Sequence, residues 1–341
     1  MRQKDKLGNV TMKDVALFTG YSTATVSRVL NNNYPVRAET KKKVLEAFEH
    51  LNYEPNLVAK SLRSRKSNLI AIIVADIENP YYIRIAKQID KVLFEKGYNL
   101  ITCSTDESIE KEQEIIRMLL SKNIDAIAIS PCDSEKTDLT ELNKRGIPIT
   151  LLDRKQEKYE KLPFVGTDNF RETYELTSKL IEKGHKDIGI LTGTLNTSTG
   201  LERFNGFKSA LSDYKLPFNK EWQFKGEFIE EKAFIAIDER LSNEQSFPTA
   251  LVSCNNVMTK GALRVFDKHG LRIPEDISIV SYGALANNNL FQVKITSLEQ
   301  DILSMGRAIA VSLLNQLESQ RLDPVEVSDS IIIEGNSIKG V

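Results

Sequence analysis

Two different hydrophobic periods divide the chain near residue 67. Before that point apolar residues recur every three or four positions, as Val26, Val29 and Leu30 do, which is the spacing of one face of an amphipathic helix. After it, short continuous apolar runs such as 69–74 alternate with helix-period segments. Such runs are typical of parallel strands that are covered on both faces. The pattern therefore predicts a small all-α head followed by a larger α/β body.

Residues 10–37 predict two short helices joined by a tight turn. Thr11 can cap the first helix, with Asp14 three residues on as a weakened capping box, and Ser22 can cap the second helix after the turn. Because the apolar residues pack inward, the outer face of the second helix is small, polar or cationic. The residues on that face are Thr23, Ala24, Thr25, Ser27, Arg28 and Asn31.

This arrangement is typical of a helix-turn-helix, whose second helix enters the major groove of DNA. Arg28 can reach guanine edges or phosphates there. On this segment alone a helical hairpin with a merely solvated outer face stays open as the alternative, since short motifs give false positives. A third helix from about 38 to 52 would close a three-helix core, and Lys41, Lys42 and Lys43 at its start can face phosphates.

Charge is unevenly spread along the chain. Residues 1–66 contain 13 Lys and Arg against 6 Asp and Glu, whereas the remainder contains 33 against 41. A basic head on an acidic body favours DNA binding by the head through phosphate neutralisation. Charged termini are common in soluble proteins, so this asymmetry supports the interpretation without deciding it.

The body repeats a strand–helix cycle twice. Strands are expected at 69–74, 99–103, 126–130, 148–152, 164–165, 188–191, 223–226, 250–253, 277–281 and 327–333, and helices at 80–96, 109–123, 138–145, 169–183, 201–212, 230–241, 258–269 and 302–319. This rhythm predicts two doubly wound α/β halves with parallel sheets. Ligands of such sheets bind outside the carboxyl ends of the strands, so two facing halves form a cleft.

The usual catalytic signatures are missing from the sequence. It contains no phosphate-binding loop, no dinucleotide-binding glycine motif and no G-x-S-x-G elbow. The polar segment 193–200 could hold a ligand but matches no phosphate-loop spacing, and Asp76 and Asp153 have no His or Cys partner beside them. We therefore expect no enzyme, no cofactor and no metal. The three cysteines are far apart and odd in number, so we expect buried thiols rather than a disulfide.

The compartment follows from two further features. No apolar stretch approaches the ~20 residues that span a membrane. The first ten residues carry cations but no apolar core of a signal peptide. We therefore expect a cytoplasmic protein that does not enter a membrane, which argues against a secreted solute-binding protein with a fused head.

Five strings make the chain resemble the LacI/GalR family of bacterial transcriptional regulators over essentially its whole length. They are VTMKDVALFTGYSTATVSRVLNN, ETKKKVLEAFEHLNYEPNLVAKSLR, IAIIVADIENPYY, PTALVSCNN and IPEDISIVSY, in this order. The resemblance implies a periplasmic-binding-protein-like core in which the chain crosses between two lobes three times. It implies a helix-turn-helix head at 1–66 with a hinge helix at about 55–64, and a core at 67–341. Lobe 1 would span about 67–162 and 293–323, and lobe 2 about 163–292 and 324–341.

The resemblance also implies how the protein acts. Two heads of a homodimer would read the half-sites of a near-palindromic, double-stranded operator. The hinge helices would lie in the minor groove, with Leu62 parting a base step and Arg63 beside it. No leucine heptads follow Ile333, which favours a dimer over a tetramer. A repressor released by a small effector is expected, with a corepressor-dependent regulator as the alternative; an enzyme or solute-binding protein with a fused head is a further alternative.

Nine residues near strand ends are expected to bind the effector. Five of them, Ser130, Asp153, Arg154, Asn255 and Gln300, are polar residues at or just after strands. The resemblance implies the other four, because Tyr81 and Tyr82 match the family's aromatic pair, Arg203 its cleft arginine and Phe228 its stacking aromatic. The family usually carries an acidic pair where this chain has Gly283 and Ala284, and it commonly has a capping Ser where this chain has Arg37. A missing anion and two retained arginines favour a sugar acid or sugar phosphate over a neutral sugar. If Arg154 instead pairs with Asp153 or a nearby Glu, a neutral sugar becomes the expected ligand.

Overall fold

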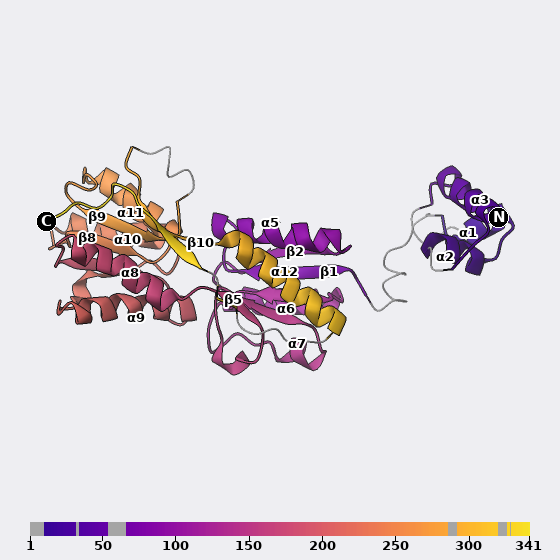
Figure 1. Cartoon of the computed structure of the whole chain (residues 1–341), viewed down its shortest axis with the longest axis horizontal. Helices are drawn as coiled ribbons and strands as arrows, with labels where there is room; N and C mark the ends of the chain where they lie inside the picture. Colours follow the sequence, from indigo (N-terminus) through magenta and orange to yellow (C-terminus); the bar gives the residue numbers. More distant parts are fainter. Residues whose placement is uncertain (1–9, 32–33, 54–65, 286–291, 320–325, 328) are drawn as a thin grey trace. The chain divides into compact units, whose positions relative to one another are not determined.

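The chain divides into two compact units, Met1–Ser67 and Asn68–Val341 (Figure 1). The structure is a computed structural model that describes residues 10–31, 34–53, 66–285, 292–319, 326–327 and 329–341. The hinge helix expected at 55–64, with Leu62 and Arg63, lies outside the described residues.

Three helices form the N-terminal unit: α1 (Met12–Thr19), α2 (Thr23–Asn31) and α3 (Ala38–His50). The Thr11 side chain accepts from the Asp14 amide while Asp14 accepts from the Thr11 amide, so the predicted capping box is complete. Gly20 caps the C-terminus of α1, and its φ of 73° suits a residue without a side chain. Buried apolar side chains from all three helices meet in one core: Val15, Ala16, Val26, Val29, Val44 and Ala47. α3 ends two residues earlier than predicted.

The first lobe of the larger unit is a six-stranded sheet of order β11-β5-β4-β3-β1-β2. Its strands are β1 (Leu69–Val74), β2 (Asn99–Ser104), β3 (Ala126–Ile129), β4 (Ile149–Leu152), β5 (Phe164–Gly166) and β11 (Glu326–Val327). Alternate residues of β1 point to opposite faces, so Ile70 and Ile72 pack in one core and Ala71 and Ile73 in another. The first core holds α5 (Pro80–Glu95) and α12 (Ile302–Ser319), and the second holds α6 (Ile109–Ser121) and α7 (Thr140–Lys144).

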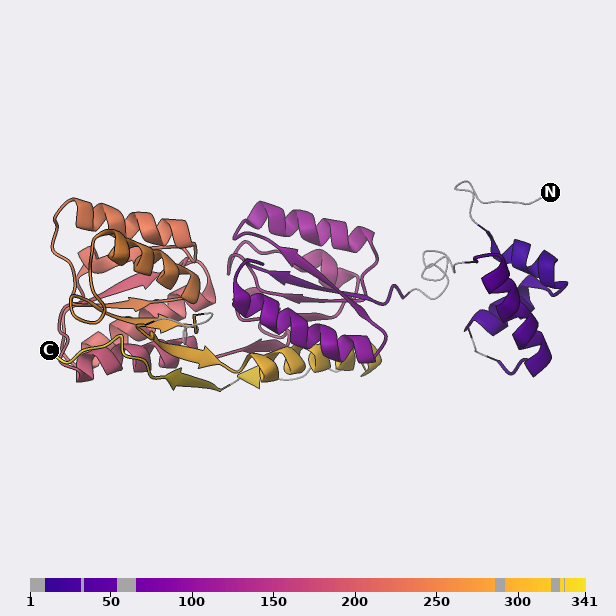
Figure 2. The same ribbon diagram turned by 90° about the horizontal axis from the view of Figure 1, so that it is seen from above.

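The second lobe repeats this design, with helices on both faces of its sheet (Figure 2). Its sheet has the order β12-β10-β9-β8-β6-β7. The strands are β6 (Ile188–Thr192), β7 (Gln223–Lys225), β8 (Ala250–Ser253), β9 (Ser278–Tyr282), β10 (Thr296–Gln300) and β12 (Ser330–Ile333). The helices are α8 (Asn169–Glu182), α9 (Ser198–Asp213), α10 (Glu230–Ser242) and α11 (Asn256–Lys268). The short 3₁₀ turns η1 (Glu157–Tyr159) and η2 (Lys220–Trp222) complete the described elements. The two-lobed α/β architecture is thus confirmed.

The chain crosses between the lobes three times, after β5, after β10 and between β11 and β12. All three crossings differ from the predicted lobe boundaries. β5 pairs with β4 in the first sheet, although the sequence placed it in lobe 2. β10 pairs with β9 and β12 in the second sheet, although lobe 1 was expected from residue 293. β11 joins β5 in the first sheet, although lobe 2 was expected from residue 324. The alternation of apolar residues predicts that a strand forms at these positions, but it does not determine which sheet the strand joins.

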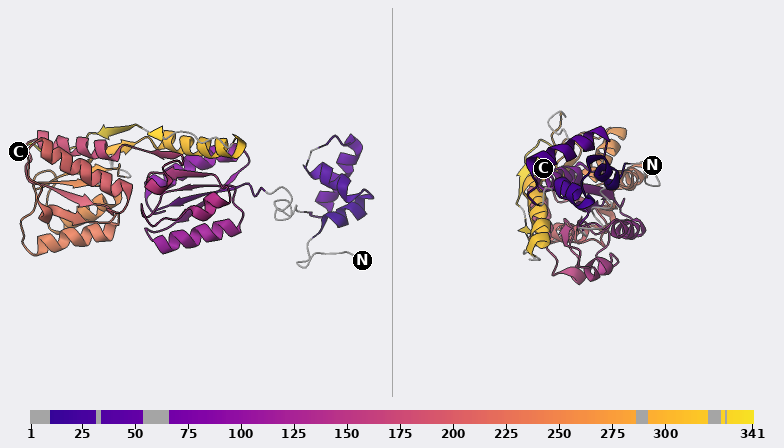
Figure 3. Two further views of the ribbon diagram at one scale, coloured as in Figure 1. Left: turned by 90° about the horizontal axis from the view of Figure 1, so that it is seen from below. Right: turned by 90° about the vertical axis from the view of Figure 1, so that its right-hand side faces the viewer.

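The C-terminal segments α12 and β12, in yellow, run along one side of both lobes (Figure 3). The first residues of α12 follow β10 directly, so the crossing between them is short. None of the helices in the described part of the chain is long and apolar enough to cross a membrane.

Candidate ligand-binding cleft and DNA-binding helix

The exposed face of α2 carries the side chains that the sequence predicted for DNA contact. Val26 and Val29 are buried in the head core, whereas Thr23, Ala24 and Arg28 are exposed. The Ser22 Oγ accepts from the Thr25 amide at 3.1 Å, so Ser22 caps the helix as predicted. Asn31 ends α2, and its side chain lies outside the described part of the structure.

Arg28 and the lysines of α3 supply positive charge to this unit. The Arg28 guanidinium lies 5.6 Å from the ring centre of Tyr34, an exposed residue. Lys43 pairs with Glu39 at 3.0 Å and Lys42 with Glu46 at 4.0 Å, all with exposed side chains. Exposed pairs of this kind are weak and salt-screened, so these lysines can exchange their partners for phosphates at little cost.

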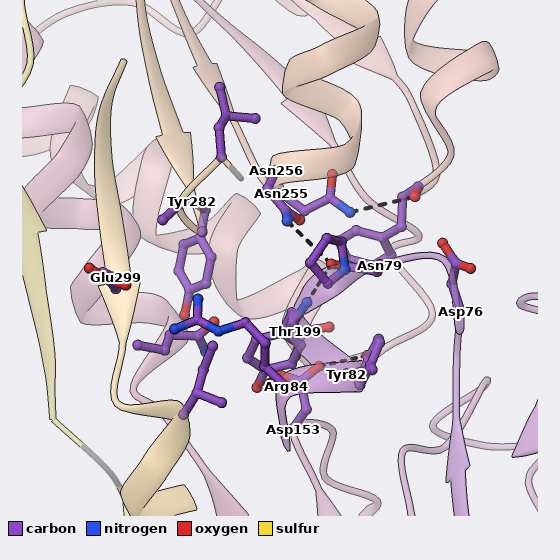
Figure 4. A pocket seen from close by; sticks show the side chains of 18 of the residues that line it. Asp76, Asn79, Tyr82, Arg84, Asp153, Thr199, Asn255, Asn256, Tyr282 and Glu299 are labelled. Carbon is purple, nitrogen blue, oxygen red and sulfur yellow. Dashed lines mark hydrogen bonds between the residues drawn. The ribbon is translucent and has the colours of Figure 1, made fainter. Parts of the chain in front are cut away.

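A cleft opens at the carboxyl ends of the strands in the larger unit, and residues of both lobes line it (Figure 4). Seven of the nine predicted effector residues lie on its wall: Tyr81, Tyr82, Asp153, Arg203, Phe228, Asn255 and Gln300. Ser130 and Arg154 are not on the wall but lie behind it, and both are buried. The position of the cleft follows the rule for doubly wound sheets.

Asp153 presents a carboxylate at the end of β4 that two tyrosines hold in place. Its backbone has a φ of 63°, in the left-handed region that is uncommon for a residue with a side chain. The Tyr81 hydroxyl donates to Oδ1 and the Tyr82 hydroxyl to Oδ2, both at 3.1 Å, and Ser130 Oγ lies 3.3 Å from the Tyr82 oxygen. Burial, and then the charge of Asp153, raise the pKa of both tyrosines, so each hydroxyl keeps its proton. The carboxylate keeps lone pairs for hydroxyl donors of a ligand.

Arg203 reaches the cleft from α9 on the opposite lobe. Its Nε donates to Asn169 Oδ1 at 2.8 Å and its Nη1 to the Cys254 carbonyl at 2.7 Å. The guanidinium lies 3.5 Å from the ring centre of Tyr282, which orients it further. Within the described residues no hydrogen bond engages its Nη2, so this group can donate to a ligand.

Arg154 does not present a free charge to the cleft. Its Nη1 and Nη2 donate to the two carboxylate oxygens of Glu107 at 2.8 and 2.6 Å, and Nη1 also donates to the Pro131 carbonyl at 3.2 Å. Only 3% of the Arg154 side chain is exposed. The alternative left open by the sequence, a pairing with a nearby Glu, is therefore the arrangement in the structure.

Sequence reasoning missed several residues of the cleft wall, among them Asn79, Asn256, Glu107 and Tyr282. Asn256 donates from Nδ2 to Asn79 Oδ1 at 3.2 Å and so joins the two lobes at one edge of the cleft (Figure 4). Both asparagines stand at helix starts that follow strand ends, a position that could have identified them. Glu107 follows β2 in the same way, and its role depends on a contact that no local pattern encodes.

The polar segment 193–200 makes further contacts between the lobes. The Ser134 amide donates to the Asn196 carbonyl and the Lys155 amide to Ser198 Oγ, both at 2.8 Å. Asn196 Nδ2 also donates to Asp133 Oδ2 at 2.5 Å. Of this segment only Thr199 lines the cleft, so the segment mainly holds the lobes together.

A buried polar cluster ties the three crossings together below the cleft. Glu172 accepts from the hydroxyls of Tyr282, Thr167 and Ser330, and Thr167 Oγ1 also accepts from Gln300 Nε2 at 3.2 Å. Thr167, Gln300 and Ser330 belong to the first, second and third crossing respectively. Burial raises the pKa of Glu172 despite these donors. Tyr282 and Gln300 also line the cleft, so ligand contacts and lobe crossings share these two side chains.

The three cysteines are free thiols, and none forms a disulfide. Cys132 and Cys254 are buried, and burial raises the pKa of each thiol to about 12. Cys103 is half-buried, and its pKa is also raised by burial. Among the residues that the structure describes, no group of three or more His, Cys, Asp and Glu side chains could hold a metal ion.

Comparison with known proteins identifies the family of this chain. Residues 11–56 match the model of bacterial regulatory proteins of the lacI family, and residues 67–338 match the model of periplasmic binding proteins and the sugar binding domain of the LacI family. The chain belongs to the LacI family. It is a DNA-binding transcriptional regulator with a two-lobed core, as the resemblance implied.

Relatives agree with this assignment over most of the chain, and a solved structure agrees with its fold. The HTH-type transcriptional repressor PurR of Pasteurella multocida is 35% identical, covering 89% of this chain and 90% of its own. The PurR repressor of Haemophilus influenzae is 32% identical, covering 97% and 99%. A lac repressor dimer bound to operator and the anti-inducer ONPF is 24% identical, covers 97% and 99%, and superposes with a TM-score of 0.84, which supports the fold.

Proposed function

We propose that this LacI-family member is a cytoplasmic transcriptional repressor that binds a near-palindromic operator as a homodimer. Two features of one chain carry the proposal: the exposed small and cationic face of α2 in the N-terminal unit, and a ligand-sized cleft in the larger unit. Two identical heads suit a two-fold symmetric site. The repressor names of the relatives and the operator-bound dimer among the structural neighbours support it.

The ligand class follows from the charges on the cleft wall. Apart from Glu107, which is paired with Arg154, three carboxylates line it, those of Asp76, Asp153 and Glu299, against the guanidiniums of Arg84 and Arg203. Arg154, on which the expectation of a sugar acid or sugar phosphate partly rested, is neutralised by Glu107. The balance therefore favours a neutral sugar with several hydroxyls, which Asp153 and Arg203 can bind from opposite sides. The anionic sugars are the second candidate.

Ligand binding would act through the relative position of the lobes. Hydrogen bonds join the two lobes at several points, and side chains from the crossings meet at Glu172. A ligand that alters these contacts shifts the equilibrium between two lobe arrangements, and the heads respond to that shift. We propose that ligand binding lowers the affinity for DNA, so that the repressor is released from its operator. A corepressor, which strengthens DNA binding, is the alternative.

The test uses the full-length protein in two steps. Operator fragments are first selected from random double-stranded DNA, and mobility-shift titrations then compare wild type, Arg28→Ala and the body variant Arg171→Ala. Arg28→Ala should weaken operator binding, whereas Arg171→Ala, whose side chain is exposed on α8, should not. Failure of wild type to select any sequence would contradict the proposed function.

The second step identifies the ligand and determines whether it weakens or strengthens operator binding. Neutral sugars and their matched uronates and phosphates are screened by thermal shift, because a ligand at 100-fold its dissociation constant adds about 2.7 kcal/mol of stability. Each stabilising compound is then added to the operator complex. Release of DNA supports an inducer, and tighter binding supports the corepressor alternative. Exclusive stabilisation by anionic sugars would overturn the neutral-ligand proposal.

A further inference from the structure

The Glu107–Arg154 pair is a second charged feature beside the cleft. Glu107 lies on the cleft wall and its side chain is 14% exposed, whereas Arg154 is 3% exposed and lies behind it. The two are bound in the bidentate geometry with which a guanidinium recognises a carboxylate or phosphate. A protein carboxylate therefore occupies the place that an anionic ligand group would take on this arginine.

Three observations indicate that Arg154 is built as an anion-binding group. Its guanidinium lies 5.2 Å from the ring centre of Phe228, a cleft-lining residue of the other lobe. Its Nε is buried without a hydrogen-bond partner among the described residues, so the protein does not fully satisfy it. The other partner of its Nη1 is the neutral Pro131 carbonyl. Within the described residues, Glu107 is therefore the one carboxylate that is hydrogen-bonded to Arg154.

The backbone at Glu107 is shaped for this contact. Asp106 and Glu107 have φ values of 51° and 57°, two successive left-handed residues in the turn between β2 and α6. Such conformations persist only where surrounding structure enforces them. The Glu107 amide donates to the Ala75 carbonyl at 3.2 Å, which fixes the turn against the end of β1. The turn thereby aims the Glu107 carboxylate at Arg154 rather than into solvent.

We propose that Glu107 is a built-in counter-anion: it occupies the anion-binding fork of Arg154 and thereby excludes anionic ligands from this end of the cleft. Glu107 is then a specificity-determining residue. This inference rests on the proposed function only in taking the cleft as the ligand site. It explains how a chain with two buried arginines at the cleft keeps a wall suited to neutral hydroxylated ligands.

The first test removes the Glu107 carboxylate from the full-length protein and asks whether a small carboxylate in solution can replace it. Glu107→Ala should unfold at a lower temperature than wild type, and acetate or formate should raise that temperature by at least about 3 °C beyond the effect of chloride at equal ionic strength. Acetamide, which has the shape of acetate without the charge, should not. The double variant Glu107→Ala/Arg154→Gln should lose the response to acetate.

The neighbouring Asp106→Ala is the matched control. Asp106 also has a positive φ, but it pairs with the exposed Lys111 at the surface. Its replacement should therefore respond to acetate no more than wild type. A Glu107→Ala protein that acetate neither stabilises nor recovers in folded form would overturn the proposal. So would an equal response of Asp106→Ala.

A second variant keeps the packing and removes only the charge. Glu107→Gln leaves Arg154 uncompensated, so inorganic phosphate and D-glucuronate should stabilise it more than they stabilise wild type, while D-glucose should not distinguish the two. Equal responses of Glu107→Gln and wild type to both anions would also refute the proposal. Neither test uses DNA, so failure of operator binding leaves these outcomes unchanged.

Discussion

The buried Tyr282–Glu172 contact offers the sharpest test of how the lobes are held. The Tyr282 hydroxyl bonds to Glu172, and it lies 2.9 Å from Thr167 Oγ1 and 3.0 Å from Asn169 Oδ1. Tyr282→Phe removes this hydroxyl and leaves the ring under Arg203. Only 1% of Tyr282 is exposed, so water does not replace the lost group without rearrangement.

The cost can be estimated from these contacts. A hydrogen bond to a charged group contributes about 1.5–3 kcal/mol, and a buried acceptor left without its donor costs about 1–3 kcal/mol. Glu172 keeps the hydroxyls of Thr167 and Ser330, so the penalty stays near one lost bond. We expect Tyr282→Phe to lower the free energy of unfolding by about 2 kcal/mol and the melting temperature by about 4–8 °C.

The penalty should also depend on pH. Burial raises the pKa of Glu172 in the folded state, so the folded protein holds this proton more strongly than the unfolded chain does. Ionised Glu172 therefore reduces stability above its folded pKa, and protonation removes that reduction as the pH falls. Because the Tyr282 hydroxyl stabilises the ionised form, Tyr282→Phe should cost more at pH 8 than at pH 5.

Urea unfolding of wild type and variant at both pH values measures the effect. Tyr214→Phe is the matched control, because Tyr214 also donates to a glutamate, Glu182, at 3.0 Å but is 40% exposed. It should cost less than about 0.5 kcal/mol. If Tyr282→Phe costs no more than Tyr214→Phe, the buried cluster does not hold the lobe crossings.

Three further predictions follow from other parts of the chain. Arg28→Ala should weaken operator binding by about 1–3 kcal/mol in mobility-shift titrations, and the affinity of wild type should fall steeply with salt; a flat salt dependence would contradict binding by the basic head. Burial lowers the pKa of His185, which is fully buried between Thr249 and Ser278, so the free energy of unfolding should decrease as the pH falls below about 6.5; His185→Gln should show a smaller decrease. Gly206→Ala should lower the melting temperature by several degrees, because its Cβ would lie 2.2 Å from the Phe170 carbonyl oxygen between α8 and α9; an unchanged melting temperature would show that the helices separate freely.

The sequence by itself determined the local elements of this protein. β1 and β8 begin and end at the residues that their apolar runs predicted, and α12 at those of its periodic segment. The capping box of Thr11 and the cap of Ser22 were also readable, because each depends on residues three positions apart. Seven of the nine predicted effector residues lie on the cleft wall, because parallel strands end at one edge of a sheet and because the family resemblance pointed to the same edge.

The tertiary structure alone decided which distant groups meet. Arg154 was assigned to the ligand, but it pairs with Glu107, 47 residues earlier, and this pairing reverses the charge argument about the ligand. No sequence pattern around Glu172 on α8 predicted its contacts. The Glu172 carboxylate nevertheless accepts hydrogen bonds from Tyr282 and Ser330, which lie 110 and 158 residues later in the chain. β5 and β10 have ordinary strand patterns that suit either sheet. Periodicity acts within about ten residues, whereas pairing and charge compensation depend on which segments the fold brings together.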